Sequence, residues 1–337
     1  MPRIDAMRPP ESVRVGTLGA APASVRRGRV WVAGYPPDLM PDLVLVGGGA
    51  PGPVLAVVAG LHGDEGAAVE AALRLAREVE PAALCGVLAL VPVANAAAFR
   101  DRRPFVNPLD GQDLERLFPG APRGGPSVRL AHALFDQVVG SADAVVDLHG
   151  GGLVEAVAPF ALAVAGGPAA TESVALAQAF GLPRLVAADM PGSLVAAAAS
   201  VGKPALRATA GSHGRGGRAA VRALADGVRG VLAALGMLAT AGPQASSPAT
   251  AVAPARWLWL EAPVDGYWRP HLRPGRRVRA GQALGTLTPR THGVAPIVIR
   301  APADGEALLV VDHLAARARS PLAALSVPDV DAGAQAR

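Results

Sequence analysis

Short apolar runs alternate with helix-forming segments through the first two thirds of the chain, and this alternation constrains the fold most. The apolar run Val54–Ala59 reads as a buried strand, and apolar residues at helical spacing follow it over residues 67–80. The same succession continues in expected strands at 87–93 and 143–148 and in expected helices at 127–139 and 172–180. Strands that alternate with helices in this way predict an α/β sheet covered on both faces.

The length and a change of composition together predict two domains. At about 150 residues per domain, 337 residues suggest two cores. Residues 241–255 are rich in Pro, Ser and Ala and carry no charge, which is typical of a linker. We therefore expect an α/β domain at residues 1–240 and a second domain at residues 256–330.

The second domain is expected to be rich in β-strands. Ala262–Gly266 reads Ala-Pro-Val-Asp-Gly and recurs as Ala-Pro-Ala-Asp-Gly at Ala301–Gly305, with short strand-like runs and glycine turns between. This region resembles the hammerhead β-domain of biotinyl and lipoyl carriers. A carrier needs an acceptor lysine, and none follows Lys203. The sequence therefore excludes a carrier and leaves a structural appendage or a lid over the site of the first domain.

Composition and charge narrow the class of protein further. Hydrophobic residues make up 51% of the chain and charged residues 18%, which excludes a disordered chain. No run reaches about 18 uninterrupted apolar residues, and the N-terminus has no secretion signal, so we expect no membrane partner and a cytoplasmic location. The net charge is +5, but the arginines are spread along the chain and aromatic residues are only 4%, which argues against nucleic acid as a partner. A disulfide within the chain is excluded, because Cys85 is the only cysteine.

Three residues in two segments form a candidate metal site. The first expected strand runs into Gly-Leu-His-Gly-Asp-Glu, which places His62 and Glu65 three residues apart where a strand turns into a helix. A later strand ends at His149 and is followed by three glycines. The carboxyl ends of strands are where open α/β sheets bind ligands. Two imidazoles and one carboxylate are the ligands of a catalytic zinc, so zinc is the metal we expect.

Asp147 is the nearest candidate for an accessory role at that site. It lies two residues before His149 and therefore on the same face of the strand. It could orient an imidazole or be an ordinary buried polar partner, and the sequence leaves both readings open.

Three motifs in a fixed order along the chain make the sequence resemble a known family. Between the two metal segments the chain reads Asp-Leu-Glu-Arg-Leu-Phe-Pro-Gly at Asp113–Gly120. With the motifs around His62 and His149, this segment resembles the succinylglutamate desuccinylase and aspartoacylase family over most of residues 14–327. The resemblance implies a zinc-carboxypeptidase-like mixed sheet flanked by helices, with a β-rich, hammerhead or barrel-like C-terminal domain. It also implies hydrolysis of the amide in a small acylated amino acid.

The resemblance assigns roles to several residues. It implies that His62, Glu65 and His149 are zinc ligands and that Arg116 binds the carboxylate of the substrate. Arg102 or Arg103 is expected to help stabilise the oxyanion, although neither is in full register with the arginine of the family.

Two positions depart from the family pattern. Glu115 replaces the Asn of the central motif, and Thr209 stands where the family has its catalytic Glu. A threonine hydroxyl cannot act as a general base near neutral pH, and losing such a base costs about 10²- to 10⁴-fold in rate. Glu115 is the first candidate replacement because it neighbours Arg116, and His213, in a glycine-rich loop, is the second. For both, a solvated surface side chain is the alternative.

Two functions remain open at this point. The first is a zinc-dependent hydrolase that cleaves an N-acyl amino acid or a related small acidic amide or ester, with an atypical general base. The second is a zinc-bearing pseudoenzyme that binds a small carboxylate through Arg116 without cleaving it, which Thr209 favours. The sequence does not indicate the acyl group, the amino acid or the oligomeric state, a homo-oligomer included.

Overall fold

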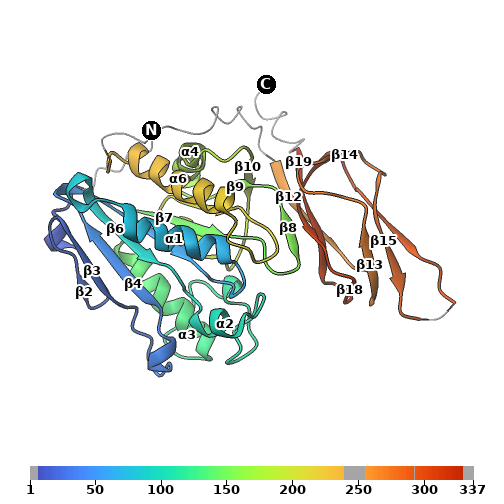
Figure 1. Ribbon diagram of the computed structural model, residues 1–337, viewed down its shortest axis with the longest axis horizontal. Helices are drawn as coiled ribbons and strands as arrows, with labels where there is room; N and C mark the ends of the chain where they lie inside the picture. The colour runs from blue at the N-terminus through green and yellow to red at the C-terminus, as the bar shows by residue number, and fades with distance from the viewer. Residues whose placement is uncertain (1–6, 239–254, 292, 329–337) are drawn as a thin grey trace.

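The computed structural model describes residues 7–238, 255–291 and 293–328, which form an α/β part and a C-terminal part made of strands (Figure 1). Most of the expected linker at 241–255 lies outside these residues; its last member, Ala255, begins the first C-terminal strand. Within the described residues, no helix combines the length and apolar character needed to cross a membrane.

A mixed sheet forms the centre of the α/β part and, within the described residues, has eight strands. In sheet order they are β10 (Leu185–Ala188), β9 (Phe160–Val164), β11 (Ala205–Thr209), β7 (Ala144–His149), β5 (Ala50–Ala59), β6 (Cys85–Val91), β4 (Asp42–Gly47) and β3 (Ser24–Arg29). The central strands β11, β7, β5 and β6 are parallel, whereas β9 pairs antiparallel with β11 and β4 with β6. The prediction of a mixed α/β sheet is confirmed.

The sheet has a core on each face because successive residues of a strand point to opposite sides. In β5, Val54, Ala56 and Val58 belong to one buried cluster. Leu55, Val57 and Ala59 belong to the other. Continuous apolar runs of this kind are what a strand covered on both faces requires.

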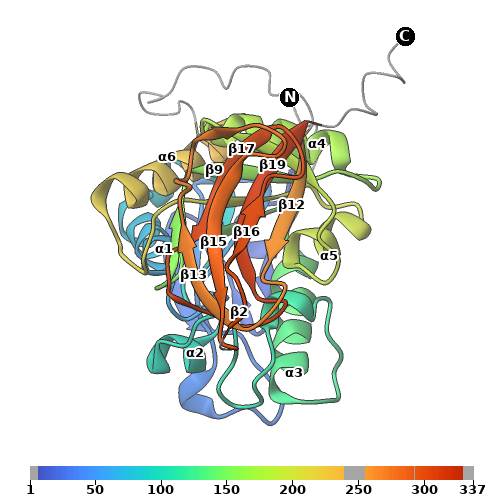
Figure 2. The ribbon, with the colours of Figure 1, turned by 90° about the vertical axis from the view of Figure 1, so that its right-hand side faces the viewer.

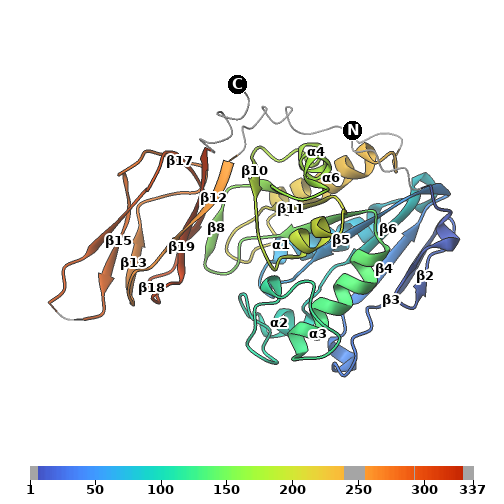
Figure 3. The same cartoon turned by 180° about the vertical axis from the view of Figure 1, so that it is seen from behind.

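Helices supply the other side of each core. On one face lie α1 (Gly66–Glu78), α4 (Ala170–Phe180) and α6 (Arg218–Ala234). On the opposite face lie α3 (Pro126–Ala133), the π-helical turn η5 (Leu134–Val139) and α5 (Leu194–Ser200), beside the short helix α2 (Ala96–Asp101). Figure 1 shows α1 and α6 in front of the sheet, and Figure 3, the reverse view, shows α3 in front.

The remaining elements of the α/β part are short. They are the strands β1 (Arg14–Val15) and β2 (Leu18–Gly19) and the 3-10 turns η1 (Pro10–Ser12), η2 (Pro37–Leu39), η3 (Pro81–Ala83) and η4 (Leu114–Arg116).

The C-terminal part consists of two antiparallel sheets, which confirms the β-rich prediction. One sheet contains β12 (Ala255–Glu261), β19 (Pro321–Pro328), β17 (Gly305–Val311) and β14 (Arg277–Val278); the other contains β16 (Ile297–Arg300), β15 (Ala283–Pro289), β13 (Gly266–Pro270) and β18 (Ala315–Ala316). The recurring pentapeptide ends where a strand begins in both copies, at Gly266 in β13 and at Gly305 in β17. Figure 2 views the molecule from the side of these strands.

The two parts are joined by a strand and by a shared core. β8 (Glu155–Val157), which follows the central strand β7, leaves the α/β part and pairs antiparallel with β17. Beside it, Phe160 and Val186 form one buried cluster with Leu308 of the C-terminal part. The rings of Phe160 and Trp257 lie 5.2 Å apart, so Trp257 of the C-terminal part also contacts the α/β part.

Candidate metal centre

Two neighbouring parallel strands, β5 and β7, bring the expected metal residues together. Because the strands are paired, the turn after Ala59 and the end of β7 lie at the same edge of the sheet. Gly60 makes this turn with a φ of +67°, which favours glycine. At Gly63, a Cβ would lie 2.1 Å from the backbone carbonyl of Ala98, so only glycine allows α2 to approach the loop so closely.

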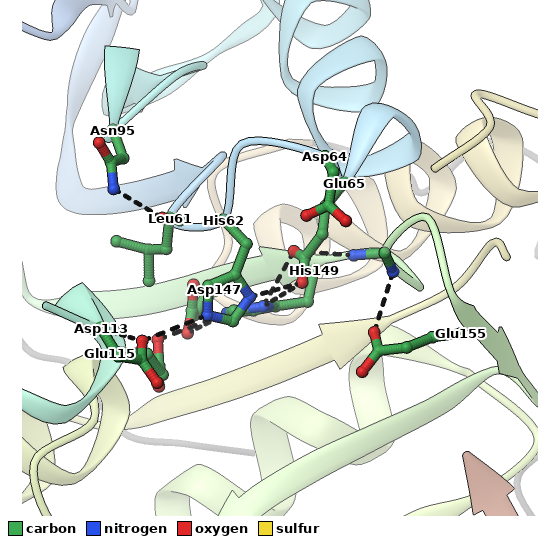
Figure 4. Close-up of polar contacts among 12 residues, drawn as sticks. Leu61, His62, Asp64, Glu65, Asn95, Asp113, Glu115, Asp147, His149 and Glu155 are labelled. Atoms are coloured by element: carbon green, nitrogen blue, oxygen red, sulfur yellow. Dashed lines mark hydrogen bonds and ion pairs between the residues drawn. The ribbon is translucent and has the colours of Figure 1, made fainter. Parts of the chain in front are cut away.

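His62, Glu65 and His149 converge at this edge, as Figure 4 shows. Nδ1 of His62 lies 2.7 Å from Oε1 of Glu65, and Nδ1 of His149 lies 3.0 Å from its Oε2. All three residues are buried, and one potential ligand atom from each lies within 4.8 Å of the others. The backbone N–H of Gly150 also donates to Oε2 of Glu65, at 3.1 Å.

The donor set fits a divalent metal ion. Two imidazole nitrogens and a carboxylate are the set preferred by zinc. Burial opposes the protonation of His62, but the nearby carboxylates of Glu65 and Asp113 outweigh it and raise its pKa to about 9. Burial likewise opposes the ionisation of Glu65, but the two histidines lower its pKa. In the metal-free site the imidazoles therefore tend to hold protons opposite an ionised Glu65, and a metal ion that binds here would displace those protons.

Each histidine has a carboxylate on the side of the ring opposite Glu65. Asp147 Oδ2 lies 2.9 Å from Nε2 of His149, and Asp113 Oδ1 lies 3.6 Å from Nε2 of His62. Carboxylates placed there orient metal-binding imidazoles and increase their basicity. The contact of Asp147 is compatible with both readings of the sequence analysis. The position of Asp113 beside His62 was not predicted, although Asp113 lies in the motif quoted for Arg116.

Glu115 and Thr209 both lie beside His149. The side chain of Asp113 accepts the backbone N–H of Glu115 and caps η4, which points Glu115 inward so that it is 7% exposed. Its Oε2 lies 3.7 Å from Nε2 of His149, and its Oε1 forms an ion pair with Arg207. Thr209 pairs directly with His149 across β11 and β7. Glu115 is thus buried rather than solvated, and its carboxylate is on the Nε2 side of the histidine.

The arginines expected to bind substrate lie toward solvent. Arg116 is the residue after Glu115 and points outward, with its side chain 77% exposed and Nε 3.1 Å from Oδ2 of Asp113. Arg102 and Arg103 are exposed at the end of α2, where the carbonyl of Arg103 accepts the N–H of Gly63. Phe105 packs its ring edge-on against His62, with ring centroids 5.6 Å apart.

His213 lies in a loop that is tied to the segment following His149. Its backbone N–H donates to the carbonyl of Glu155, and that of Gly214 donates to the carbonyl of Gly151. The side chain of Ser212 accepts the N–H of Val157. His213 is half-buried, and these backbone contacts hold its loop against β8.

Arg207 and Glu155 are buried charged residues near the site that were not assigned from the sequence. Arg207 interrupts the apolar strand β11, and a charged residue in such a run was the available signal. Glu155 is 5% exposed and accepts the N–H of Gly152. Nothing in its local sequence indicated burial, because its strand partner, β17, lies about 150 residues further on.

The fold and the site together define an α/β protein with a buried group of two histidines and one glutamate that could hold a metal ion. A sequence model described as succinylglutamate desuccinylase/aspartoacylase catalytic domain matches residues 51–235. The chain belongs to this family.

Individual relatives agree with that assignment. N-alpha-acetyl-L-2,4-diaminobutyric acid deacetylase from Halomonas elongata is 34% identical over 134 residues, which span 39% of this chain and 39% of that protein. The crystal structure of a succinylglutamate desuccinylase/aspartoacylase from Rhodobacter sphaeroides is 25% identical, with a TM-score of 0.79 over 91% of this chain and 95% of that one. The product-bound ectoine utilization protein EutE (DoeB) from Ruegeria pomeroyi shares the fold, at 24% identity and a TM-score of 0.80 over 92% of this chain and 98% of that one.

Proposed function

We propose that the protein is a zinc-dependent deacylase that cleaves the amide of a small N-acyl amino acid. The observation that carries this proposal is the meeting of His62, Glu65 and His149 at one edge of the sheet. Membership of the family supports the reaction type, and the deacetylase from Halomonas elongata supports an acylated amino acid as substrate.

In this reaction, different residues of the chain would bind the metal, the substrate carboxylate and the amide oxygen. His62, Glu65 and His149 would hold the metal, which when bound polarises the carbonyl of the scissile amide. Arg116 lies near the site on the solvent side and would bind the carboxylate of the substrate by exchanging Asp113 for it. Arg102 or Arg103, beside the loop that carries His62, would stabilise negative charge on the amide oxygen.

The general base is the least conventional part of the proposal, because Thr209 cannot serve. Glu115 is the first candidate as a buried carboxylate beside His149, and as the base it would have to reach the metal-bound water from the Nε2 side of that ring. Its pairing with Arg207 favours the ionised form that a base needs. His213 is the second candidate, because its loop contacts the segment that follows His149.

The test uses purified protein with and without a chelator. Substrates are N-acetyl-L-2,4-diaminobutyrate, N-acetylaspartate and N-succinylglutamate, and the released amino acid is measured. We expect zinc-dependent release from at least one of them. Glu115→Gln and His213→Ala are compared at saturating zinc, and the residue that acts as the base loses about 10²- to 10⁴-fold in rate while its variant still binds zinc. A variant with unchanged turnover removes that residue from the role.

A second function is favoured by one observation, the presence of Thr209 next to His149 in place of a carboxylate. In this alternative the protein binds zinc and a small carboxylate through Arg116 without hydrolysis. Stoichiometric zinc with no turnover of any substrate, together with binding of the free amino acids or acyl acids by calorimetry, would support the binder over the deacylase.

A further inference from the structure

Arg207 is a buried cation in the centre of the sheet, and above it appears only as the ion-pair partner of Glu115. All five residues of β11 are buried, and the side chain of Arg207 is only 10% exposed. A charge taken out of water is strongly destabilising unless other groups compensate it. The contacts of its guanidinium group therefore indicate the role of Arg207.

Two carboxylates compensate Arg207. Oε1 of Glu115 forms an ion pair with its Nη2, and Oδ2 of Asp147, on the neighbouring strand, lies 3.4 Å from its Nε. The register pairs Arg207 with Asp147 directly, which places both side chains on the same face of the sheet. Arg207 thus bridges a carboxylate from η4 and one from β7.

The same two carboxylates flank one edge of His149. Oδ2 of Asp147 lies 2.9 Å and Oε2 of Glu115 lies 3.7 Å from Nε2 of the ring. Figure 4 shows Glu115 and Asp147 gathered beside the two histidines. The opposite ring nitrogen, Nδ1, faces Glu65. The orientation of the ring is therefore fixed by carboxylates on both sides.

Two buried carboxylates that share one ring edge repel each other unless a cation lies between them. Arg207 supplies that cation, and its planar guanidinium can contact both carboxylates at once, which a point charge cannot do equally well. Without it, one carboxylate has to move away or water has to enter, and His149 loses part of the contact that orients it.

We infer that Arg207 is a positioning residue: it holds Glu115 and Asp147 against Nε2 of His149 and so keeps Nδ1 directed toward Glu65 and a metal ion. The inference rests on the metal site of the proposed function. It predicts that positions 115 and 207 act as one unit in metal binding.

The experiment is a double-mutant cycle in zinc affinity. Metal-free wild type, Arg207→Gln, Glu115→Gln and the double variant are titrated with zinc against a chelating competitor at one pH. Loss of a group that orients a metal-binding histidine typically weakens metal binding by about 10- to 100-fold, which is the loss expected for Arg207→Gln. The double variant should recover much of this loss, because it removes the excess negative charge together with the cation.

A matched control separates this effect from the loss of any arginine. Arg74 pairs with Glu78 on the exposed face of α1, so Arg74→Gln should bind zinc as the wild type does. If Arg207→Gln does not fold, Arg207→Lys takes its place; it keeps the charge without the two-pronged geometry and should show a smaller loss of zinc affinity.

The outcomes distinguish this inference from the proposed function. A wild type that binds no stoichiometric zinc overturns the metal site itself. If the wild type binds zinc and the Arg207 variants bind it equally well, or if the double variant loses as much as the two single losses combined, the positioning role is wrong.

Discussion

The burial of Glu155 makes the unfolding free energy of the protein depend on pH. Burial raises its pKa to about 7, and the negative charges of Glu65 and Asp64 act in the same direction. The N–H of Gly152, which donates to its carboxylate, opposes the shift without cancelling it. The group therefore favours the protonated form in the folded chain at a pH where the unfolded chain has already released the proton.

The sign of the effect follows from proton binding. Between about pH 4.5, the ordinary value, and about pH 7, the folded state binds one proton more than the unfolded state at this position. The contribution of Glu155 to stability is therefore complete below that window and is lost as the pH rises through 7. The unfolding free energy lost in this way is on the order of 3 kcal/mol. Glu155→Gln should flatten the decline in unfolding free energy of the metal-free protein between pH 5 and pH 8, measured by denaturant titration.

The exposed Glu80 provides the control for this prediction. Glu80→Gln should leave the pH dependence of the unfolding free energy as it is in the wild type. An identical decline in the Glu155→Gln variant would show that Glu155 titrates in the folded protein as it does in water.

Arg116 is expected to act on substrate binding. A hydrogen bond to a charged group is worth about 1.5–3 kcal/mol, which corresponds to about 10- to 100-fold in affinity. Arg116→Ala should therefore raise KM by about that factor for a substrate with a free carboxylate, measured by steady-state kinetics. Arg123→Ala, at another exposed arginine of the same region, should change KM little. Equal KM values for the wild type and Arg116→Ala would remove Arg116 from the substrate site.

At the scale of single residues, spacing predicted that His62, Glu65 and His149 lie together, but it did not predict the side chains that surround them. His62, Glu65 and His149 could be singled out because each stands next to the end of a strand, and the carboxyl ends of parallel neighbours meet. The partner of Arg207 could not be predicted, since Glu115 comes from a 3-10 turn that faces the sheet only in the folded chain. Charge pairs between segments that are distant in the sequence have no characteristic spacing from which they could be predicted.

At the scale of elements, the packing of α6 on α4 depends on a glycine. A Cβ at Gly227 would lie 2.1 Å from the ring of Phe180, which is buried at the end of α4. Alanine stabilises a helix by about 1 kcal/mol relative to glycine, whereas overpacking a core costs about 1–3 kcal/mol. Because the contact is so short, we expect an overpacking cost near the upper end of that range, which exceeds the gain in helix stability. Gly227→Ala should therefore lower the unfolding free energy by about 1–2 kcal/mol in a denaturant titration.

Gly166 serves as the comparison for Gly227. It lies in a loop with a negative φ, and no atom would lie within 4 Å of an added Cβ. Gly166→Ala should therefore leave stability unchanged or slightly raise it. A Gly227→Ala variant more stable than the wild type would show that the ring of Phe180 moves aside at little cost.

The longer helices and strands were predictable from periodicity, whereas the short strand β8, which pairs with the C-terminal part, was not. The expected helix at 67–80 is α1, Gly66–Glu78, and the expected strand at 143–148 is β7, Ala144–His149. Their apolar patterns are long enough to show a period. β8 has three residues and pairs with β17, so neither its length nor its neighbours in the sequence indicate the pairing.

At the scale of the whole molecule, the α/β part and the C-terminal strands share a core and should unfold together. Leu308 of β17 is fully buried in the cluster that contains Phe160 of β9. Leu308→Ala should lower the unfolding free energy of the single transition by about 2–5 kcal/mol, measured by calorimetry and denaturant titration. Val298→Ala, at an exposed position of β16, is the control and should have little effect. Two separate transitions, with only the weaker one shifted by Leu308→Ala, would contradict a shared core.

The zinc content and zinc affinity of the purified protein are the sharpest test of the metal site. This metal site predicts one tightly bound zinc per chain in the wild type and a loss of more than about 100-fold in affinity for His62→Ala, Glu65→Gln and His149→Ala. His313→Ala, at an exposed histidine of the C-terminal part, should bind zinc normally. A wild type without stoichiometric zinc, or a His149→Ala variant that binds zinc as tightly as the wild type, would contradict it.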